Sequence, residues 1–183
     1  GTMPPDYVGG LTATGINNLK EFVRDGGTLI FMNTTCNLAT QEFKTPVRNI
    51  LEKARREEFN CVGSILQAEF DLSHPVAYGL SNPQPIIFAD SCAFDFYPSF
   101  TDKNAPRIVA RYGADNLLLS GWIYGQNLVQ QKAAIVEVPV EKGRLILLGF
   151  PVQYRAQPRG TFKLLFNSIF YSSVKTGSGQ KDR

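Results

Sequence analysis

The chain has 183 residues, of which 43% are hydrophobic and 19% charged, a composition typical of one globular domain. Nineteen basic and sixteen acidic residues give a net charge of +3, which is too small to indicate a nucleic acid or an anionic membrane as partner. No apolar run approaches the ~20 residues that a membrane-spanning helix needs. We therefore expect one domain, residues 1–174, followed by a disordered tail rich in Gly, Ser and Lys, residues 175–183.

The first elements are predicted from helical and strand-like patterns. Residues 11–25 are expected to form a helix, because Ile16, Leu19, Phe22 and Val23 share one stripe. Thr12 or Thr14 can cap its start, and Gly26-Gly27 can end it. Residues 28–32 are a short apolar run of strand length. Since helices are expected on both sides in sequence, this run suits the centre of a parallel sheet, where both faces are buried.

The next segment is expected to be helical. A polar turn containing Cys36 follows the strand, with a short helix over residues 38–43. Thr45-Pro46 is typical of a fresh helix start, because Pro is tolerated at the first helical position. The apolar stripe of this second helix would be Val47, Ile50, Leu51 and Ala54.

From residue 59 the pattern changes to short strands. The strands are predicted over residues 65–70, 86–89, 93–97, 107–112, 133–138 and 144–150. The last two flank the turn Glu141-Lys142-Gly143 and are expected to form a hairpin. The final helix, residues 161–173, has the strongest helical pattern, an apolar stripe made of Phe162, Leu165, Phe166, Ile169 and Phe170.

This order of elements predicts an α/β fold of three layers, with a largely parallel sheet and an antiparallel hairpin at its edge. Doubly wound sheets usually begin with a strand, whereas this chain begins with a loop and a helix. We therefore expect that one or more N-terminal βα units lie upstream or have been removed.

Several segments, taken in order, resemble a known fold. The run from Pro4 to Gly10, with Leu19, Phe22-Val23 and the segment Gly26 to Leu29, is similar to the class I glutamine amidotransferase-like fold in the region leading to its nucleophile elbow. Further matching segments are Pro46-Val47-Arg48-Asn49, Ser73-His74-Pro75, Leu119-Ser120-Gly121-Trp122, Gly143 to Phe150 and Gly160 to Asn167. Together they resemble the C-terminal amidotransferase-like domain of bacterial zinc carboxypeptidase-like proteins of the carboxypeptidase A family.

The resemblance implies where the metal would lie. A zinc carboxypeptidase needs two His and one Glu as zinc ligands, and this chain has one histidine, His74. We expect no cofactor in this chain and zinc in an upstream peptidase domain, which would be the partner within the same polypeptide. A homo-oligomer is a further possibility. A carboxypeptidase parent would favour a secreted or periplasmic location.

The resemblance also bears on catalysis. An amidotransferase needs a Cys nucleophile at the elbow and a His base. The resemblance places Asn33 at or near the nucleophile position and Cys36 about three residues later, and no His occurs in the C-terminal third. The triad is therefore expected to be absent. The alternative is that Cys36 is a nucleophile with His74 as its base. The simpler interpretation is that Cys36 is a passive thiol and that His74 is a turn histidine, which either faces solvent or is hydrogen-bonded to the backbone.

Two further places are candidates for ligand binding. Gln153, Arg155, Gln157 and Arg159 lie in the loop before the final helix, where two guanidinium groups and a helix N-terminus can bind an anion. The alternative is that they cap the helix or pair with acids. Trp122, with Tyr124, would stack on a sugar or pack against a partner domain, although packing in the core is the simpler interpretation.

The sequence thus leads to one main expectation for function. It is a non-catalytic accessory domain of a zinc metallocarboxypeptidase-like protein, with a structural or substrate-access role. The first alternative is a module that binds a small anion or carbohydrate. The second is a cryptic Cys hydrolase. An exposed apolar face would favour the accessory role, because such faces mark docking surfaces.

Overall fold

The computed structural model describes residues 3–5, 9–97 and 105–174. Its helices and strands, in chain order, are α1 (Ala13–Arg24), β1 (Thr28–Met32), η2 (Asn33–Thr35), α2 (Cys36–Glu42), β2 (Val47–Asn49), β3 (Val62–Phe70), η3 (Pro75–Ala77), β4 (Gln84–Ala89), β5 (Phe94–Phe96), β6 (Arg107–Tyr112), β7 (Leu118–Ser120), η5 (Gln126–Leu128), β8 (Ala133–Val140), β9 (Gly143–Leu148), η6 (Arg159–Thr161) and α3 (Phe162–Ser172). The η elements are single 3₁₀ turns. The expected tail, 175–183, lies outside the described residues. None of the helices described is long and apolar enough to cross a membrane.

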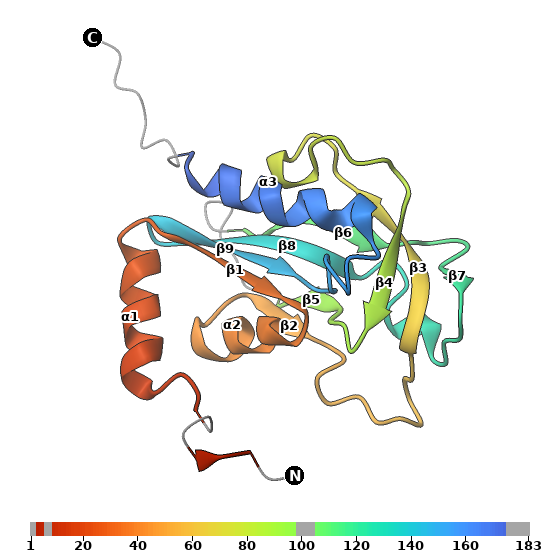
Figure 1. The fold of residues 1–183 in the computed structure, drawn as a ribbon, viewed down its shortest axis with the longest axis horizontal. Helices are drawn as coiled ribbons and strands as arrows, with labels where there is room; N and C mark the ends of the chain where they lie inside the picture. Colours follow the sequence, from red (N-terminus) through yellow and green to blue (C-terminus); the bar gives the residue numbers. More distant parts are fainter. Residues whose placement is uncertain (1–2, 6–8, 98–104, 175–183) are drawn as a thin grey trace.

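All the strands named above belong to one mixed sheet (Figure 1). Its main path has the order β1-β9-β8-β6-β3-β4, while β5 joins β2 to β8 and β7 pairs with β3. Among the described pairs, β1 with β9 is parallel, and the remaining pairs are antiparallel. The prediction of a largely parallel sheet is therefore wrong. The described segments between β3 and β9 contain turns and loops rather than crossover helices, and a parallel pair needs a long crossover.

Two strands occupy other places than predicted. The hairpin of β8 and β9 is confirmed, with Ile135 opposite Leu148 and Val140 opposite Gly143, but it lies inside the sheet rather than at its edge. The strand expected at the centre, β1, forms the end of the main path and pairs with β9 alone among the described strands.

Helices cover both faces of the sheet, with α3 on one face and α1 and α2 on the other (Figure 1). The central hairpin sends alternate side chains into two cores. Ile135, Ile146 and Leu148 pack in the cluster that includes Leu164 of α3. Val136, Leu145 and Leu147 pack in the cluster that includes Cys36 and Ala39 of α2. The strand period of two explains why both sides of this hairpin are apolar.

The N-terminal helix and strand follow the prediction closely. Thr12 caps α1, accepting a hydrogen bond from the Gly15 N–H at 3.3 Å. Gly26 ends the helix with a φ of 108°, a backbone conformation that favours glycine. Ile16 and Val23 are buried, whereas Phe22 of the predicted stripe is 52% exposed, so the stripe is the packed face of α1 except at Phe22.

The helix predicted from Thr45 is wrong. Val47–Asn49 is the strand β2, antiparallel to β5, and the chain then continues through turns. Val47 is buried and lies opposite Phe96, while Arg48 is exposed. This alternation has the strand period. Over so short a run, a strand cannot be distinguished from a helix by apolar spacing.

The final helix is confirmed, but its buried face differs from the predicted stripe. Leu164 and Ser168 are fully buried, whereas Phe166 and Phe170 are 56% and 72% exposed. The Ser168 hydroxyl donates to the Leu164 carbonyl at 2.6 Å, so its polar atom is satisfied inside the protein. The apolar stripe of α3 therefore lies largely at the surface.

Candidate functional site

A sharp strand-to-helix turn follows β1, as the resemblance implies. Asn33 has a φ of 54°, a left-handed conformation that is uncommon for residues other than glycine. Thr35 holds the turn, since its hydroxyl accepts from the Met32 N–H at 2.9 Å and donates to the Met32 carbonyl at 2.7 Å. Asn33 is thus held in strained backbone at the apex of an elbow-like turn.

Asn33 is not equipped to act as a nucleophile. Its amide nitrogen donates to the Ala89 carbonyl at 3.1 Å. Its amide oxygen is buried and has no hydrogen-bond partner among the described residues. A carboxamide has no acidic proton to lose at neutral pH, so the residue at the apex can hold the turn but cannot attack a carbonyl carbon.

Cys36, the first residue of α2, is fully buried. Its thiol contacts the Leu148 carbonyl at 3.5 Å. Burial, together with the neighbouring thiol of Cys92, raises the pKa of Cys36 well above its ordinary value. Because the thiolate is the nucleophilic form, this environment makes Cys36 unreactive.

A cleft of about 290 Å³ lies beside the elbow. It is bordered by Thr34 and Asn37 after β1 and by Asp90, Ser91 and Cys92 after β4. Clefts at the carboxyl ends of strands are the usual ligand position in α/β sheets. The cleft therefore keeps the position of an active site, although the residues around it lack a catalytic pair.

Two amides form the rigid wall of this cleft. The Asn49 amide nitrogen donates to the Asn37 amide oxygen at 2.8 Å. The Asn49 oxygen accepts from the backbone N–H groups of Leu51 and Ala93 at 3.1 and 3.2 Å. Sequence analysis missed both residues, because their meeting depends on the pairing of β2 with β5. Nothing in the sequence around Asn37 or Asn49 indicates that the two side chains meet.

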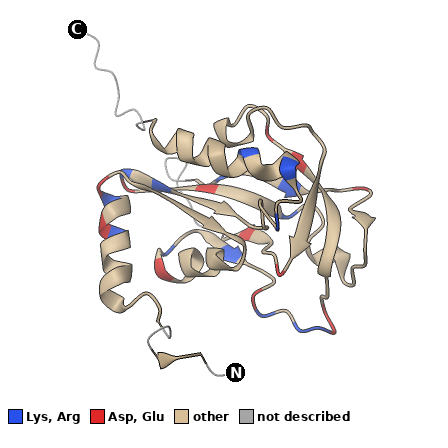
Figure 2. Cartoon of the chain, viewed as in Figure 1, with Lys and Arg blue, Asp and Glu red and all other residues tan. Residues whose placement is uncertain are grey.

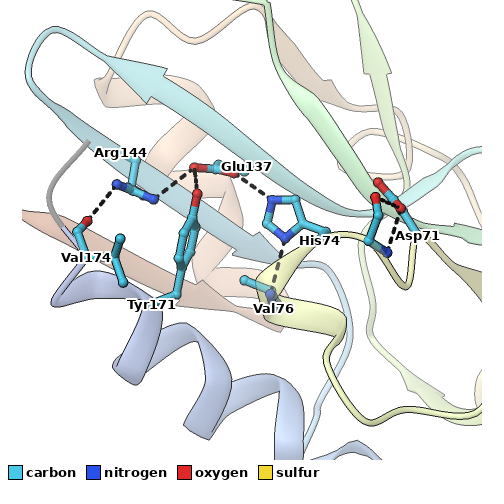
Figure 3. Close-up of polar contacts among 8 residues, drawn as sticks. Asp71, His74, Val76, Glu137, Arg144, Tyr171 and Val174 are labelled. Carbon is cyan, nitrogen blue, oxygen red and sulfur yellow. Dashed lines mark hydrogen bonds and ion pairs between the residues drawn. The ribbon is translucent and has the colours of Figure 1, made fainter. Parts of the chain in front are cut away.

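His74 is buried and lies away from the elbow. It is 1% exposed, so it does not face solvent, and it is hydrogen-bonded to the backbone. Its Nδ1 accepts from the Val76 N–H at 3.2 Å, and its Nε2 lies 2.6 Å from a Glu137 carboxylate oxygen (Figure 3). Since Nδ1 accepts, the proton belongs on Nε2 and is donated to Glu137. Neither ring nitrogen is left to take a proton from a substrate.

Glu137 connects His74 to two further side chains. Its second oxygen accepts from Arg144 and from the Tyr171 hydroxyl, both at 3.3 Å. The Arg144 guanidinium lies 4.2 Å from the centre of the Tyr171 ring and donates to the Val174 carbonyl at 3.1 Å. This buried network, comprising His74, Glu137, Arg144 and Tyr171, ties α3 and the η3 loop to the central hairpin (Figure 3).

The network sets the ionisation of Glu137. Burial raises the pKa of its carboxyl group, but the hydrogen bond from His74 and the charge of Arg144 outweigh burial, so that the pKa lies below its ordinary value. The carboxylate is therefore charged at neutral pH and paired with Arg144, as a buried charge requires. His74 donates a hydrogen bond to this carboxylate and so helps to hold the fold together.

The structure separates Cys36 from His74. Cys36 belongs to the core on the α2 side of the sheet. His74 lies on the α3 side, where its ring packs edge-on against Tyr171 at 5.6 Å. The sheet between them excludes a direct Cys–His pair, and without that pair a thiol nucleophile has no base.

The loop before α3 carries the predicted anion-binding residues at the surface. Gln153, Arg155, Gln157 and Arg159 are all exposed. The Arg155 guanidinium lies 5.5 Å from the centre of the Tyr154 ring. The position at the start of η6 and α3 is as expected. These side chains are accessible to a ligand, and ligand binding in this loop stays a prediction.

Trp122 lies in another part of the molecule, after β7. It is 55% exposed, so the prediction of core packing is wrong. Its ring lies nearly parallel to that of Tyr124, with centres 6.4 Å apart. The Ser64 hydroxyl donates to the Trp122 carbonyl at 2.7 Å. These backbone contacts fix the segment on β3 and turn the indole outward.

Beside the buried network, α3 and the η3 loop enclose a second hollow of about 580 Å³. Leu72, Tyr78, Phe170 and Val174 line it, and each is more than 45% exposed. His74 and Tyr171 lie at its floor. The hollow is thus apolar at the rim, and the polar atoms of His74 and Tyr171 at its floor already form hydrogen bonds to Glu137.

Metal ligands are not gathered anywhere in the described residues, where no group of three or more His, Cys, Asp or Glu side chains could hold an ion. The described Lys, Arg, Asp and Glu residues are distributed over many elements of the fold (Figure 2). The described residues thus form an elbow-like turn after β1 and a packed interior. Among them we find no group of side chains arranged for acid–base, nucleophilic or metal chemistry.

Comparison with known proteins bears on the fold. No family model and no curated protein matches the chain. Among solved structures, it is similar to the cytoplasmic protein STM3548 from Salmonella typhimurium, with a TM-score of 0.55 and 14% identity over 91% of this chain and 63% of that one. A ThuA-like protein from Bacteroides uniformis gives 0.50 and 11%, covering 87% and 64%. The cytoplasmic protein STM1381 from Salmonella typhimurium gives 0.51 and 10%, covering 85% and 59%.

The fold is thus similar to that of ThuA-like and class I glutamine amidotransferase-like proteins. At these identities the likeness concerns the fold alone. The chain spans less than two thirds of the length of each of these three structures. The zinc carboxypeptidase association has no support from the comparisons and rests on the sequence resemblance.

Proposed function

We propose that this chain is a non-catalytic accessory domain of a larger protein, of the zinc metallocarboxypeptidase-like kind, in which it docks on a neighbouring peptidase domain and shapes access to it. One observation carries the proposal. The elbow presents Asn33 where a nucleophile would stand, while His74 is locked by Glu137 and Val76 on the other side of the sheet. A fold with an active-site shape whose His74 is held by internal hydrogen bonds suits a structural role.

An exposed apolar surface supports the docking role. On α3, Phe166, Ile169 and Phe170 are 56%, 49% and 72% exposed, and Val174 beyond its end is 57% exposed. We call these four residues the outer α3 face. Apolar patches of this kind mark interaction sites in soluble domains. The face lies opposite Leu164 and Ser168, which pack on the sheet, so it points away from the core of the described residues.

The alternative of a small-molecule module retains one favourable observation. Arg155 and Arg159 are exposed next to the first turn of α3. Guanidinium groups beside a helix N-terminus favour anions. Saturable binding of phosphate or a peptide carboxylate, lost in the Arg155→Ala, Arg159→Ala double variant, would favour this alternative over the accessory role.

A hydrolysis assay tests the absence of catalysis. The chain is incubated with glutamine, with p-nitrophenyl esters and with peptides ending in a free carboxylate. We expect any residual turnover to be the same in wild type, Cys36→Ser and Cys92→Ser, because the thiols are buried and lack a base. A loss of more than about tenfold in kcat/KM in Cys36→Ser alone, with folding intact by circular dichroism, would contradict the proposal.

A further inference from the structure

We infer that the cleft beside the elbow is a binding site for a neutral polyhydroxy compound of the size of a monosaccharide, held by the side-chain amides of Asn37 and Asn60 against the ring of Phe59. The inference goes beyond the accessory role, because a domain can hold a sugar without reacting with it. It also places the ligand away from the loop of Arg155 and Arg159, neither of which lines the cleft. The observation behind it is a set of polar groups that the fold positions in the cleft and leaves unused.

Three segments build the cleft. Two sides lie at the carboxyl ends of strands, since Thr34 follows β1 and Asp90 follows β4. The segment between β2 and β3 forms the third side with Phe59 and Asn60 (Figure 1). Asn33, the neighbour of Thr34, and Asp90 have φ angles of 54° and 48°. Such strained backbone gathers at ligand sites and persists only where the surrounding structure holds it. The walls of the cleft are thus held in place by the fold.

Two side-chain amides in the cleft keep unused hydrogen-bonding groups. The Asn37 oxygen accepts from the Asn49 amide at 2.8 Å, so the Asn37 nitrogen is left over, and it has no hydrogen bond among the described residues. The Asn60 backbone pairs with Tyr124 in both directions, at 3.1 and 2.8 Å. The Asn60 side chain has no partner in the described part of the chain. Each residue is thus anchored by one group and can serve a ligand with another.

An unused acceptor lies in the turn that borders the cleft. The Asn33 amide oxygen is buried and has no hydrogen bond within the described residues. The Cys92 thiol, which lines the cleft, donates to the Asn33 carbonyl at 3.3 Å, so the turn and the cleft are in contact. Buried polar atoms nearly always have a partner. A hydroxyl group of a ligand can rotate to donate, and it would supply that partner.

The distribution of charge favours a neutral ligand. The charged residues of the cleft, Glu52, Arg56 and Asp90, are exposed and thus lie at its mouth. The lining residues that are buried or half-buried, such as Asn49 and Ser91, are uncharged. A carboxylate or ammonium group placed among them would lose its hydration without gaining a counter-charge, which is costly. Hydroxyl groups both donate and accept, so they match amides in either direction.

The aromatic wall and the volume of the cleft point to a single sugar ring. Phe59 and Phe88 line the cleft and pack edge-on, with ring centres 5.7 Å apart. The C–H groups on the faces of a sugar ring are apolar and pack on such a wall, while its hydroxyl groups reach the polar atoms around it. The volume of 290 Å³ lies at the lower end of the range for small-molecule sites, about 300–1,000 Å³. This leaves room for one ring rather than for an oligosaccharide.

An NMR titration tests the inference on the ¹⁵N-labelled chain of 183 residues. The probes are glucose, galactose, mannose, ribose and myo-inositol, each added separately. We expect at least one of them to shift the side-chain amide signals of Asn37 and Asn60 along a saturable curve. The absence of a saturable shift with every probe would overturn the inference. Saturable shifts confined to the surroundings of Trp122 or Arg155 would overturn it as well.

An isosteric variant separates ligand binding from folding. Asn37→Asp keeps the oxygen that accepts from Asn49 and replaces the unused nitrogen by oxygen. Its affinity for the sugar should fall by about fivefold or more, because one hydrogen bond to the ligand is lost. Asn60→Ala removes a side chain without a partner among the described residues, so it should stay folded and lose affinity by a similar factor. Trp122→Ala, outside the cleft, is the control and should bind as wild type does. Unchanged affinity in both Asn variants would overturn the inference.

Charged compounds of similar size test the selectivity for a neutral ligand. Glutamine, glutamate and gluconate should bind about tenfold or more weakly than the best sugar, because the uncharged interior of the cleft offers them no counter-charge. Competition in the same NMR titration measures this ratio. A zwitterion or an anion that binds more tightly than every sugar would overturn the inference.

Discussion

At the scale of single residues, the buried network decides how α3 is held. His74, Glu137 and Arg144 are each no more than 5% exposed, and each finds its partners inside the protein. A buried charge that loses its partner is strongly destabilising, whereas the intact pair contributes little net stability. The network therefore fixes which segments meet more than it raises the free energy of unfolding.

Replacing Glu137 by Gln should show this in the pH dependence of stability. The pKa of Glu137 is lowered on folding, so its stabilising contribution is complete above the ordinary glutamate value of about 4.3 and is lost as pH falls through the folded-state pKa. At pH 7 we expect Glu137→Gln to cost about 3–5 kcal/mol, because Arg144 loses its counter-charge. Urea unfolding between pH 3 and pH 7 measures both the cost of the variant at pH 7 and the loss of the Glu137 contribution at low pH.

The same experiment has a milder comparison. Tyr171→Phe removes one hydrogen bond to Glu137 and keeps the ion pair, so it should cost about 0.5–1.5 kcal/mol and preserve the acid dependence.

The stability difference between Glu137→Gln and wild type should shrink below pH 4. A difference that stays constant with pH would show that the carboxylate is not the group that titrates.

At the scale of elements, α3 has two apolar faces with different roles. Leu164→Ala should lower the free energy of unfolding by about 2–5 kcal/mol, because Leu164 is fully buried. Phe166→Lys and Phe170→Lys should change it by less than about 0.5 kcal/mol, because these side chains lie at the surface. Both Lys variants should reduce binding of the dye ANS. Strong destabilisation by either would mean that the stripe is part of the core after all.

The sequence predicted those elements whose signals are local. α1, β1 and the hairpin of β8 and β9 were expected from an apolar helical stripe, a glycine pair, apolar runs and a tight turn. β2 was missed, because Val47, Ile50 and Leu51 have helix-like spacing while the pairing with β5 is remote in sequence. Strand direction was missed for the same reason, since it depends on which strands meet.

The site was predictable only in part. The elbow turn and Asn33 at its apex followed from the resemblance and agree with the positive φ. The Glu137 partner of His74 lies 63 residues away, and Glu137 occurs in a strand whose other residues are apolar. A lone acid in an apolar strand is the signal that was available, and it indicates a buried pair.

At the scale of the whole molecule, the reactivity of the cysteines measures how readily each of the two cores opens. Cys36 belongs to the cluster on the α2 side and Cys61 to the cluster on the α3 side, and Cys36, Cys61 and Cys92 are free and buried. We expect a thiol reagent such as DTNB to modify them slowly in the native protein. All three should react at once in concentrated guanidinium chloride.

The rates in increasing denaturant show whether the cores open together. Two-state unfolding predicts one rate constant for the three thiols, because one opening exposes both cores. Mass spectrometry of partly labelled protein gives the order of modification. Reaction of Cys36 well before Cys61 would instead show that the α2 side opens on its own.

The pairing of β1 with β9 has a consequence for the order of folding. β8 and β9 are joined by a tight turn, so their contacts form with little loss of chain entropy. Thr28 must find Arg144 from the opposite end of the chain, and such distant pairings form late in folding. The polypeptide from α1 to α2 is thus the last part to join the sheet. During synthesis it emerges before β9 and must wait for it, so its apolar β1 stays exposed until β9 has been made.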